Sequence, residues 1–467
     1  MRIIPKINIT LDEINVATHA IPSYKKNAAI QAIVTNSKEA LPGDLFVALQ
    51  GEKKCGDDFI GEAISRGAYV MSSKLNTADL FVQDTYIALL DLALYYKTKL
   101  PSLKKTIAVT GSVGKTTTKN ILKDMLSTCF KVHATKENYN NFLGLFHTVL
   151  STPRETEVLI AELGMNHTGE ISLLSKALHP DISIITNIGS SHIGNLGSRE
   201  LIASAKLEIL DGMSSLNLIV QKEEALLLSA KGRYTVSLED TTADTCVIPK
   251  HLLPTHSLVD IYTKFGKLSM QKIALPGRHI LSAVAFAVEA MILIGIDIKK
   301  IEHSLKCLQL TSVRGKFIDI GDFTVYDDTY SSSREAVLSD FDLLSLYKER
   351  NRSCVLGDML ELGDFSEEIH KEIGRAAATH GFERIFAFGN YSSFIKAGAI
   401  EGGFAEDKIF VNADITNPDY TAKQILDNCV GGEIILFKAS HEVHAERILK
   451  ILTSLIEDKN QKQKGKN

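Results

Sequence analysis

The chain lacks the features that mark disulfide-bonded, zinc-binding and membrane-spanning proteins. Its N-terminal stretch MRIIPKINIT has no signal-peptide core, and its longest apolar run, residues 280–296, is shorter than a typical membrane span and carries Glu289. Its six cysteines are scattered without a CxxC pair: Cys55, Cys129, Cys246, Cys307, Cys354 and Cys429. Such spacing argues for reduced thiols and against a disulfide scaffold or a zinc site. We therefore expect a cytoplasmic protein with no membrane span.

The chain also lacks an excess of either charge. Lysine and arginine number 52 against 56 acidic residues, for a net charge of −4, and hydrophobic residues make up 45%. This composition is that of an ordinary globular protein without the polybasic surface of a nucleic-acid binder. We expect no nucleic-acid partner, and a substrate that is bound by local chemistry. A length of 467 residues predicts about three domains.

The rest of the chain is organised around the segment TIAVTGSVGKTTTKN, residues 106–120. It reads as a buried strand, a glycine turn and a helix, which together direct free N–H groups and the helix dipole at one point. Lys115 can reach the β- and γ-phosphates of a nucleotide, and the Thr116 hydroxyl can ligate Mg²⁺. The turn is a shortened P-loop, since Val109 stands where the usual spacing has glycine. A packing turn is the alternative, but Lys-Thr-Thr favours a nucleoside triphosphate site made by Thr110, Gly111, Ser112, Val113, Gly114, Lys115, Thr116 and Thr117.

Two more apolar runs end in polar side chains. Residues 156–162 end in Glu162, and residues 181–186 lead to His192. Because parallel strands place ligand groups beyond their carboxyl ends, we expect both side chains to converge on the phosphate loop. A carboxylate there is a natural Mg²⁺ ligand, whereas a lone histidine is more often structural.

Lys206 lies on the apolar stripe of a predicted helix, residues 198–212, four residues after Ile202. Either its stem packs while its amine reaches water, or the amine is neutralised or modified near a metal, because a buried ammonium is costly. The spacing leaves both open. Asn140 and Asn141, in a loop with Asn138, are likewise either Asx-turn residues or ligand contacts.

The order of predicted elements indicates an α/β fold with three domains. Residues 1–103 form a small α/β unit, in which Asn36 and Ser37 at a strand end are either a binding edge or a polar turn. Residues 104–312 form a central α/β domain whose parallel sheet carries the phosphate loop. Residues 313–456 alternate strands and helices, which predicts a doubly wound Rossmann-like sheet, although no GxGxxG for a dinucleotide is present. The polar tail 457–467 is expected to be disordered.

Distinctive motifs run along nearly the whole chain. They are TNSKEALPGDLFVALQGE (35–52), RGA (66–68), TGSVGKTTTK (110–119), NYNNFLG (138–144), AELGMN (161–166), TNIGSSHIGNLGS (186–198), AKLEIL (205–210), PGRH (276–279), YDDTY (326–330), VLGDMLELGDFSEEIH (355–370) and LFKAS (436–440). With them the chain resembles the Mur ligases, the ATP-dependent amide-bond synthetases of peptidoglycan precursor assembly. The combination of LGDMLELG, AELGMN and PGDLFVAL is that of the member that adds a dipeptide.

The resemblance implies an ADP-forming ligase with ATP and two Mg²⁺ ions. Its substrates would be UDP-N-acetylmuramoyl-tripeptide and D-alanyl-D-alanine, joined through an acyl phosphate, and we expect a monomer. The implied catalytic residues are Lys115, Glu162, His192 and Lys206, and the implied metal-site residues are Thr116, Glu162, His192 and Lys206. Lys206 would carry a carbamate that bridges to the second metal.

The resemblance also implies ligand contacts outside the phosphate loop. The first domain would hold the uridine-diphosphate end of the substrate, and the last domain the dipeptide and part of the nucleotide. The implied nucleotide contacts are His279, Lys316, Asp328 and Tyr330. The implied substrate contacts are Asn36, Ser37, Asn140, Asn141, Asp358, Glu361 and Lys438.

Several positions depart from the family pattern, chiefly at base and substrate contacts. They are Asn36 and Lys38 for aspartate and arginine, Ile280 for asparagine, Lys316 for arginine, Ser331 and Ser333 in a run that usually contains asparagine, and Ala439 and His441 for glycine and arginine. Two alternatives stay open: a relative that joins another amino acid or peptide to a nucleotide-linked substrate, and a weakly active regulatory relative. The sequence does not choose between lysine and diaminopimelate at the third peptide position.

Overall fold

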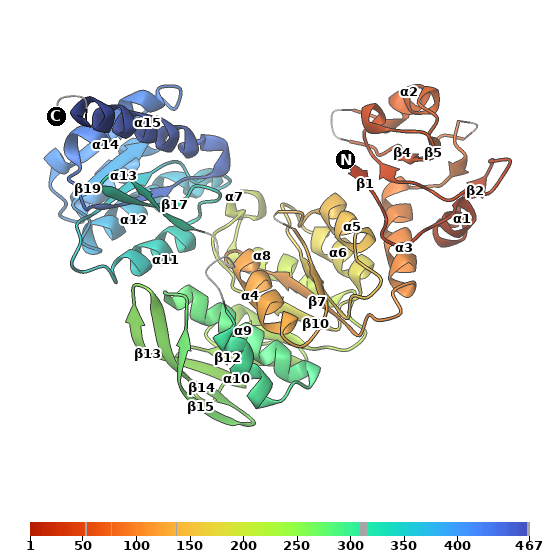
Figure 1. The fold of residues 1–467 in the computed structure, drawn as a ribbon, viewed down its shortest axis with the longest axis horizontal. Coiled ribbons are helices and arrows are strands. Elements are labelled where there is room, and N and C mark those ends of the chain that lie inside the picture. The colour runs from red at the N-terminus through yellow and green to blue at the C-terminus, as the bar shows by residue number, and fades with distance from the viewer. Residues whose placement is uncertain (52–53, 76, 137, 309–314, 465–467) are drawn as a thin grey trace.

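The computed structural model describes residues 1–51, 54–75, 77–136, 138–308 and 315–464, with side chains as far as residue 458. Three lobes follow one another in an open arc, with the two chain ends on opposite arms (Figure 1). Each lobe has its own sheet, so the predicted three-domain α/β fold is confirmed. The predicted boundary at residues 312 and 313 lies outside the described residues. In the part of the chain that is described, no helix is both long and apolar enough to cross a membrane.

The first lobe is a six-stranded sheet in the order β1-β3-β4-β5-β6-β2. Its middle strands are short apolar runs that pair in parallel, as strands buried on both faces do. Helix α1 begins with a capping box of Thr10 and Glu13, and Asp84 caps α3. The bounds are β1 Arg2–Ile3, α1 Leu11–Thr18, β2 Ile21–Pro22, β3 Ile33–Val34, β4 Leu45–Val47, α2 Ile60–Ser65, β5 Tyr69–Ser72, β6 Leu80–Phe81 and α3 Thr85–Thr98.

The second lobe has a nine-stranded sheet in the order β15-β14-β13-β12-β11-β10-β7-β9-β8, with β7 inside its parallel part. Side chains of β7 alternate: Ile107 and Val109 pack with α4 and α9, and Ala108 faces the α5–α6 side. The bounds are β7 Lys105–Thr110, α4 Lys115–Ser127, β8 Val132–Ala134, α5 Phe142–Leu150, β9 Val158–Glu162, α6 Glu170–Leu178, β10 Ile182–Ile185, α7 Ile193–Leu196, α8 Arg199–Leu207, β11 Leu218–Gln221, β12 Arg233–Ser237, β13 Thr245–Leu253, β14 His256–Thr263, β15 Gly266–Ile273, α9 Arg278–Ile294 and α10 Ile298–Lys306.

The third lobe is a doubly wound sheet in the order β16-β17-β21-β18-β19-β20, in which the pairing of β16 with β17 is antiparallel and the other pairings of these strands are parallel. Helices α14 and α15 pack on one face and α11, α12 and α13 on the other. The bounds are β16 Lys316–Ile320, β17 Phe323–Asp328, α11 Arg334–Leu344, β18 Arg352–Leu356, α12 Ser366–Thr379, β19 Arg384–Phe388, α13 Ser392–Glu401, β20 Ile409–Asn412, α14 Pro418–Asn428, β21 Ile434–Lys438 and α15 Ala445–Lys464.

The tail differs from the expectation of disorder from residue 457. Helix α15 continues to Lys464. Its apolar residues Ile448, Leu452 and Ile456 are buried against the third lobe, and the lysines and glutamines that follow are good helix formers. Because α15 is anchored by these apolar residues, the helix continues through polar residues that contribute nothing to the hydrophobic core.

The first lobe is attached to the second mainly through α3, which packs on α5 and α6. The Lys97 ammonium donates hydrogen bonds to the carbonyls of Leu178 and His179 at the end of α6. The rings of Tyr86 and Phe142 meet edge-on, with centroids 4.9 Å apart. These contacts place α3 beside α5 and α6 of the second lobe (Figure 1).

Candidate nucleotide and metal site between the lobes

A cavity of about 910 Å³ lies between the lobes and is lined by residues of all three. Tyr86 reaches it from the first lobe, the phosphate loop from the second, and Asp328 and Tyr330 from the third. Concave sites where domains meet are the usual place for small-molecule ligands. Of the predicted nucleotide loop, Ser112 to Thr117 line this cavity, and Thr110 and Gly111 precede them along the chain.

The phosphate loop is shaped by glycine and held by a neighbouring loop. Gly111 has φ +145°, and a Cβ atom there would lie 1.9 Å from the Thr186 hydroxyl oxygen, so no side chain fits. The Asn187 side-chain oxygen accepts hydrogen bonds from the backbone N–H groups of Ser112 (3.1 Å) and Val113 (2.9 Å). Lys115 begins α4 and donates to the Gly111 carbonyl at 2.7 Å. The strand, turn and helix predicted from residues 106–120 are therefore present.

Glu162 ends β9 directly beside this loop and is 1% exposed. One carboxylate oxygen accepts from the Thr116 hydroxyl at 2.9 Å, and the other accepts from the Asn140 side-chain amide at 3.0 Å. Asn140 thus contacts a predicted metal ligand, and both line the cavity. A buried carboxylate with such donors is held in one orientation.

Lys119 is a charged neighbour of Glu162 that the sequence prediction missed. It is 2% exposed, its ammonium donates to the Thr135 carbonyl at 2.7 Å, and it lies 3.7 Å from a Glu162 carboxylate oxygen. The available signal was its position four residues after Lys115, on the same side of the helix. Its charge offsets that of the buried carboxylate.

His192 and Glu361 meet across the second and third lobes. His192 caps α7 with φ 64°, and its Nδ1 lies 2.6 Å from a Glu361 carboxylate oxygen. This contact with His192 lowers the pKa of Glu361. A predicted metal ligand and a predicted substrate contact are thus paired in this arrangement, and both line the cavity.

The donor set facing the cavity suits Mg²⁺. Thr116, Glu162 and His192 offer a hydroxyl, a carboxylate and an imidazole, and hard oxygen donors are those that Mg²⁺ prefers. Among the described residues, no three His, Cys, Asp or Glu side chains form a ready metal-binding group. The metal-ligand assignment stays a prediction.

Lys206 is buried in α8, with 1% of its surface exposed. The alternative in which its amine reaches water is therefore wrong. Burial, with a smaller contribution from the Lys115 charge, lowers the pKa of Lys206 well below that of a free lysine. Burial therefore favours the neutral form of the amine over the charged one. Lys206 is not among the described residues that line the cavity.

Lys438 is the centre of a buried charge cluster on the third-lobe wall of the cavity. Its ammonium is paired with Asp328, its register partner on β17, and lies 3.0 Å from an Asp340 oxygen on α11. Burial raises the pKa of Asp340 to about 7, and the two carboxylates raise that of Lys438 despite burial. Burial also lowers the pKa of His279, which lines the cavity from α9 of the second lobe, to about 4. Lys438, predicted as a substrate contact, is thus engaged by two carboxylates.

The other predicted contacts are divided between the cavity and the rest of the molecule. Asp358 is buried and accepts hydrogen bonds from the N–H groups of Asn390 (2.9 Å) and Tyr391 (3.0 Å), so it closes a turn. In the first lobe, the Asn36 side chain accepts a hydrogen bond from the Lys38 N–H, and the Ser37 hydroxyl donates to Glu62. Asn141 caps α5 at the cavity. In the third lobe, Lys316 is exposed at the start of β16, and the Tyr330 ring faces that of His441 with centroids 5.7 Å apart. Asn36, Ser37, Lys316 and Asp358 are outside the described lining.

Among the departures from the family pattern, Ile280 is buried in the core of α9 and Ala439 in the third lobe. Ser331, Ser333 and His441 line the cavity. Ser333 also caps α11, because its side chain accepts from the Ala336 N–H. The departures on the cavity wall therefore gather on the third lobe.

Comparison with known proteins agrees with this geometry. The Mur ligase middle domain family matches residues 109–291. The UDP-N-acetylmuramoyl-tripeptide--D-alanyl-D-alanine ligase of Bacillus subtilis is 34% identical over 93% of this chain and 95% of its own length. The ligase of the same name from Rickettsia prowazekii is 32% identical over 89% of this chain and 93% of its own length.

Solved structures are also similar. A crystal structure of MurF from Acinetobacter baumannii has a TM-score of 0.86 and 28% identity, and the match covers 97% of this chain and 100% of that one. MurF ligase from Thermotoga maritima in complex with ADP has a TM-score of 0.79 and 26% identity, covering 91% of this chain and 98% of that one.

Proposed function

The chain belongs to the Mur ligase family, and we propose that it is the member that joins D-alanyl-D-alanine to UDP-N-acetylmuramoyl-tripeptide with conversion of ATP to ADP. The observation that carries the proposal is the cavity, because it brings the phosphate loop, the buried Glu162 and side chains of all three lobes to one place. A ligase with three substrates needs such a shared site. The full-length similarity to two ligases of this name supports the choice of substrates.

The reaction starts with the γ-phosphoryl group. Lys115, at the head of α4, holds the β- and γ-phosphates, and the Thr116 hydroxyl and Glu162 carboxylate face the same space. Thr116, Glu162 and His192 would hold Mg²⁺, which neutralises phosphate charge when bound. The terminal carboxylate of the tripeptide attacks the γ-phosphorus, so that ADP leaves and an acyl phosphate forms.

The second step forms the amide. The amine of D-alanyl-D-alanine attacks the acyl carbon, the carbon–oxygen bond to phosphate breaks, and inorganic phosphate leaves with the amine proton lost to solvent. The third lobe, with Tyr330 and Glu361 on its wall, would bring in the dipeptide and keep water from the acyl phosphate. Catalysis is then mainly positioning and charge stabilisation.

For Lys206 we propose carbamylation. The neutral amine is the form that attacks carbon dioxide, and its burial and low pKa favour that form. The product is a carbamate with release of one proton, so that the neutral amine becomes an anion. Lys206 does not line the cavity in this structure, so the resemblance to the Mur ligases, and not the cavity lining, supports placing this anion beside the divalent cations.

We also propose that the enzyme is a cytoplasmic monomer. None of its six cysteines forms a disulfide, which is consistent with a reducing compartment. Sedimentation would test the monomer.

The test is phosphate release by the purified chain with ATP, Mg²⁺, UDP-N-acetylmuramoyl-tripeptide and D-alanyl-D-alanine, against omission of each in turn. We expect release only with the full set, together with the pentapeptide product by mass spectrometry. Lys115→Ala is the matched inactive control, with a loss on the order of 10²-fold or more. Running lysine and diaminopimelate tripeptides in parallel identifies the third residue.

Other outcomes separate the alternatives. Release that is faster with a different amino acid or peptide acceptor would indicate a relative with another substrate. No release with any acceptor, from a folded chain that binds ADP, would indicate a regulatory relative.

A further inference from the structure

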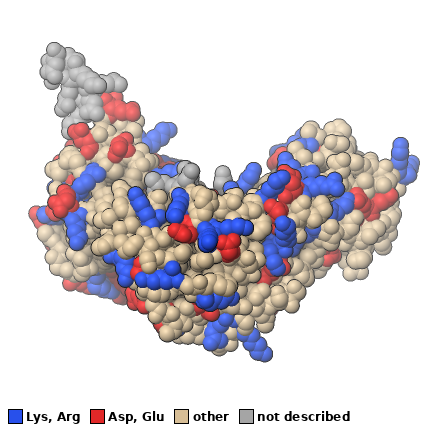
Figure 2. All heavy atoms as spheres, turned by 60° about the horizontal axis from the view of Figure 1, so that its bottom comes forward, with Lys and Arg blue, Asp and Glu red and all other residues tan. Residues whose placement is uncertain are grey.

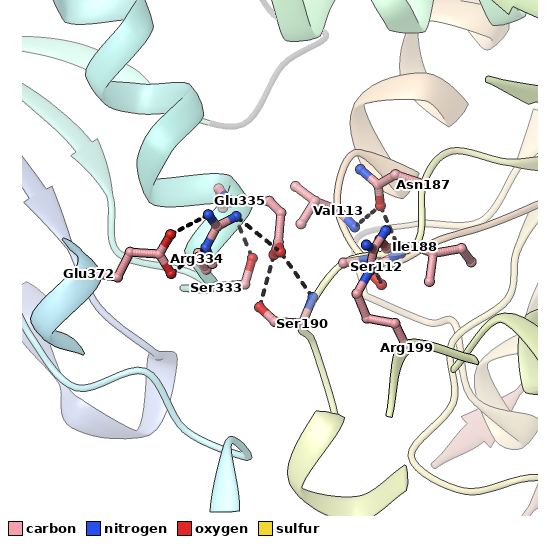
Figure 3. Close-up of polar contacts among 12 residues, drawn as sticks. Ser112, Val113, Asn187, Ile188, Ser190, Arg199, Ser333, Arg334, Glu335 and Glu372 are labelled. Carbon is pink, nitrogen blue, oxygen red and sulfur yellow. Dashed lines mark hydrogen bonds and ion pairs between the residues drawn. The ribbon is translucent and has the colours of Figure 1, made fainter. Parts of the chain in front are cut away.

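A carboxylate of the third lobe is docked on the loop that supports the phosphate loop. We call residues 187–192 the support loop. The Ser190 backbone N–H donates to one oxygen of Glu335, and the Ser190 hydroxyl donates to the other, each at 3.0 Å (Figure 3). Glu335 lies in the first turn of α11, where the helix dipole favours a negative charge. This contact joins residues 145 positions apart.

The support loop in turn holds the phosphate loop. Besides the two hydrogen bonds to Asn187, the Gly189 N–H donates to the Ser112 hydroxyl oxygen at 2.9 Å (Figure 3 draws Ser112 and Asn187). The same support loop ends in His192. Glu335 therefore contacts the support loop, which is hydrogen-bonded to the phosphate loop and ends in a predicted metal ligand.

The absence of a side chain at Gly189 leaves space for the Glu335 carboxylate. A Cβ atom on Gly189 would lie 2.7 Å from the carboxyl carbon of Glu335, and the three nearest atoms all belong to Glu335. Gly189 is not among the glycines with positive φ, so its conformation does not by itself require glycine. The missing side chain makes room for a residue of another lobe.

Glu335 also projects from a fixed point. Its neighbour Arg334 forms a two-pronged ion pair with Glu372 on α12, with Nε 2.6 Å from one carboxylate oxygen (Figure 3). Such pairs hold both partners in one orientation. The start of α11 is thus fastened within the third lobe, and Glu335 moves when that lobe moves.

We propose that Glu335 is a positioning residue that couples seating of the third lobe to the geometry of the phosphate loop. When the lobe is seated, its carboxylate holds Gly189 and Ser190, which hold Ser112. When the lobe moves away, the Ser190 donors lose their acceptor and the support loop relaxes. The effect on turnover rests on the proposed function, whereas the effect on the two loops does not.

The first test compares Glu335→Ala and Glu335→Gln with Glu367→Ala. Glu367 is an exposed carboxylate on α12 and serves as the control for lost surface charge. The readouts are hydrogen–deuterium exchange of peptides that cover 187–192 and 111–116, the affinity for mant-ADP with Mg²⁺, and kcat and KM for ATP. These are measured on the full chain.

In Glu335→Ala we expect faster exchange in both peptides, weaker mant-ADP binding and a kcat lower by on the order of tenfold, since hydrogen bonds to a charged group are lost. Glu335→Gln should recover part of each effect, because its amide accepts from the Ser190 N–H and donates to the hydroxyl. Glu367→Ala should match the wild type. Wild-type exchange in both peptides of Glu335→Ala would overturn the proposal.

The second test is the cycle of Gly189→Ala, Glu335→Ala and the double variant. If the new methyl group acts by displacing the Glu335 carboxylate, the double variant is no worse than Glu335→Ala alone. Additive losses in exchange and mant-ADP affinity would overturn the proposal. A wild-type enzyme without ligase activity would instead overturn the proposed function, and the exchange and nucleotide readouts would still decide the role of Glu335.

Discussion

Replacing Lys119 by methionine should loosen the buried side of the proposed metal site. Methionine has a similar length but removes the charge that lies 3.7 Å from a Glu162 oxygen and the hydrogen bond to the Thr135 carbonyl. Both lysine and glutamate are almost completely buried, so water cannot take over either role.

The magnitude follows from these contacts. Two unit charges at 3.7 Å attract by about 4 kcal/mol at an effective dielectric constant of about 20. The hydrogen bond adds about 1.5–3 kcal/mol, and relief of the buried ammonium's desolvation offsets several kcal/mol. We expect a net loss of about 3 kcal/mol, in the range seen when one partner of a buried pair is removed. For a lobe of this size that is a Tm lower by roughly 6–12 °C.

The assay is thermal unfolding of the variant with and without ADP and Mg²⁺. If Glu162 holds a divalent cation as proposed, that cation would supply the missing positive charge, so ADP with Mg²⁺ should raise the Tm of Lys119→Met more than that of the wild type. Lys123→Met is the matched control, because Lys123 lies one turn further along α4 and is exposed. The reasoning is refuted if Lys119→Met and Lys123→Met have the same Tm and the same response to Mg²⁺.

Three further predictions concern one buried and two partly buried side chains. Lys206→Ala should be nearly inactive and partly rescued by short carboxylic acids in a phosphate-release assay, whereas Lys206→Arg should not be rescued, because its guanidinium keeps the wrong charge; full activity of Lys206→Arg would contradict the carbamate. Lys97→Met should lower the Tm, since its ammonium donates to the Leu178 carbonyl across two lobes, with a loss of about 1.5–3 kcal/mol; an unchanged Tm would contradict this. Burial lowers the pKa of His133 from 6.5 to about 4, so the unfolded chain takes up this proton first and the free energy of unfolding falls as the pH drops through that window. His133→Gln should flatten the dependence of Tm on pH between about pH 7 and about pH 5, and an unchanged slope would count against it.

Local sequence was enough wherever one segment carries the whole signal. The strand, glycine turn and helix of residues 106–120 were predicted from consecutive residues alone. The glycine in that turn is required, because the backbone conformation of Gly111 and its close contact with Thr186 exclude a side chain. The alternation of Ile107, Ala108 and Val109 likewise requires only the period of a strand. The position of Glu162 beside the loop followed from the rule for strand ends in a parallel sheet.

Local sequence misled where the outcome depends on packing against distant residues. The tail beyond residue 457 is polar, yet the apolar stripe before it anchors α15, and the helix continues to Lys464. Asp358 is a predicted substrate contact by motif, and local sequence did not indicate that it also accepts hydrogen bonds from Asn390 and Tyr391 of the next strand–helix connection. Its substrate role stays a prediction.

The sequence by itself therefore determined the family, the three-part α/β fold and the phosphate loop, since each of these is recorded in continuous segments. Only the tertiary structure decided which charges meet. Lys119 with Glu162, His192 with Glu361, and Glu335 with Ser190 are separated by 43, 169 and 145 positions, and no periodicity relates them. These residues meet because of the order of strands in the sheets and the way the lobes pack against one another. In a buried site, the partner of a charged group determines whether that charge is stable, held in one orientation and available for chemistry.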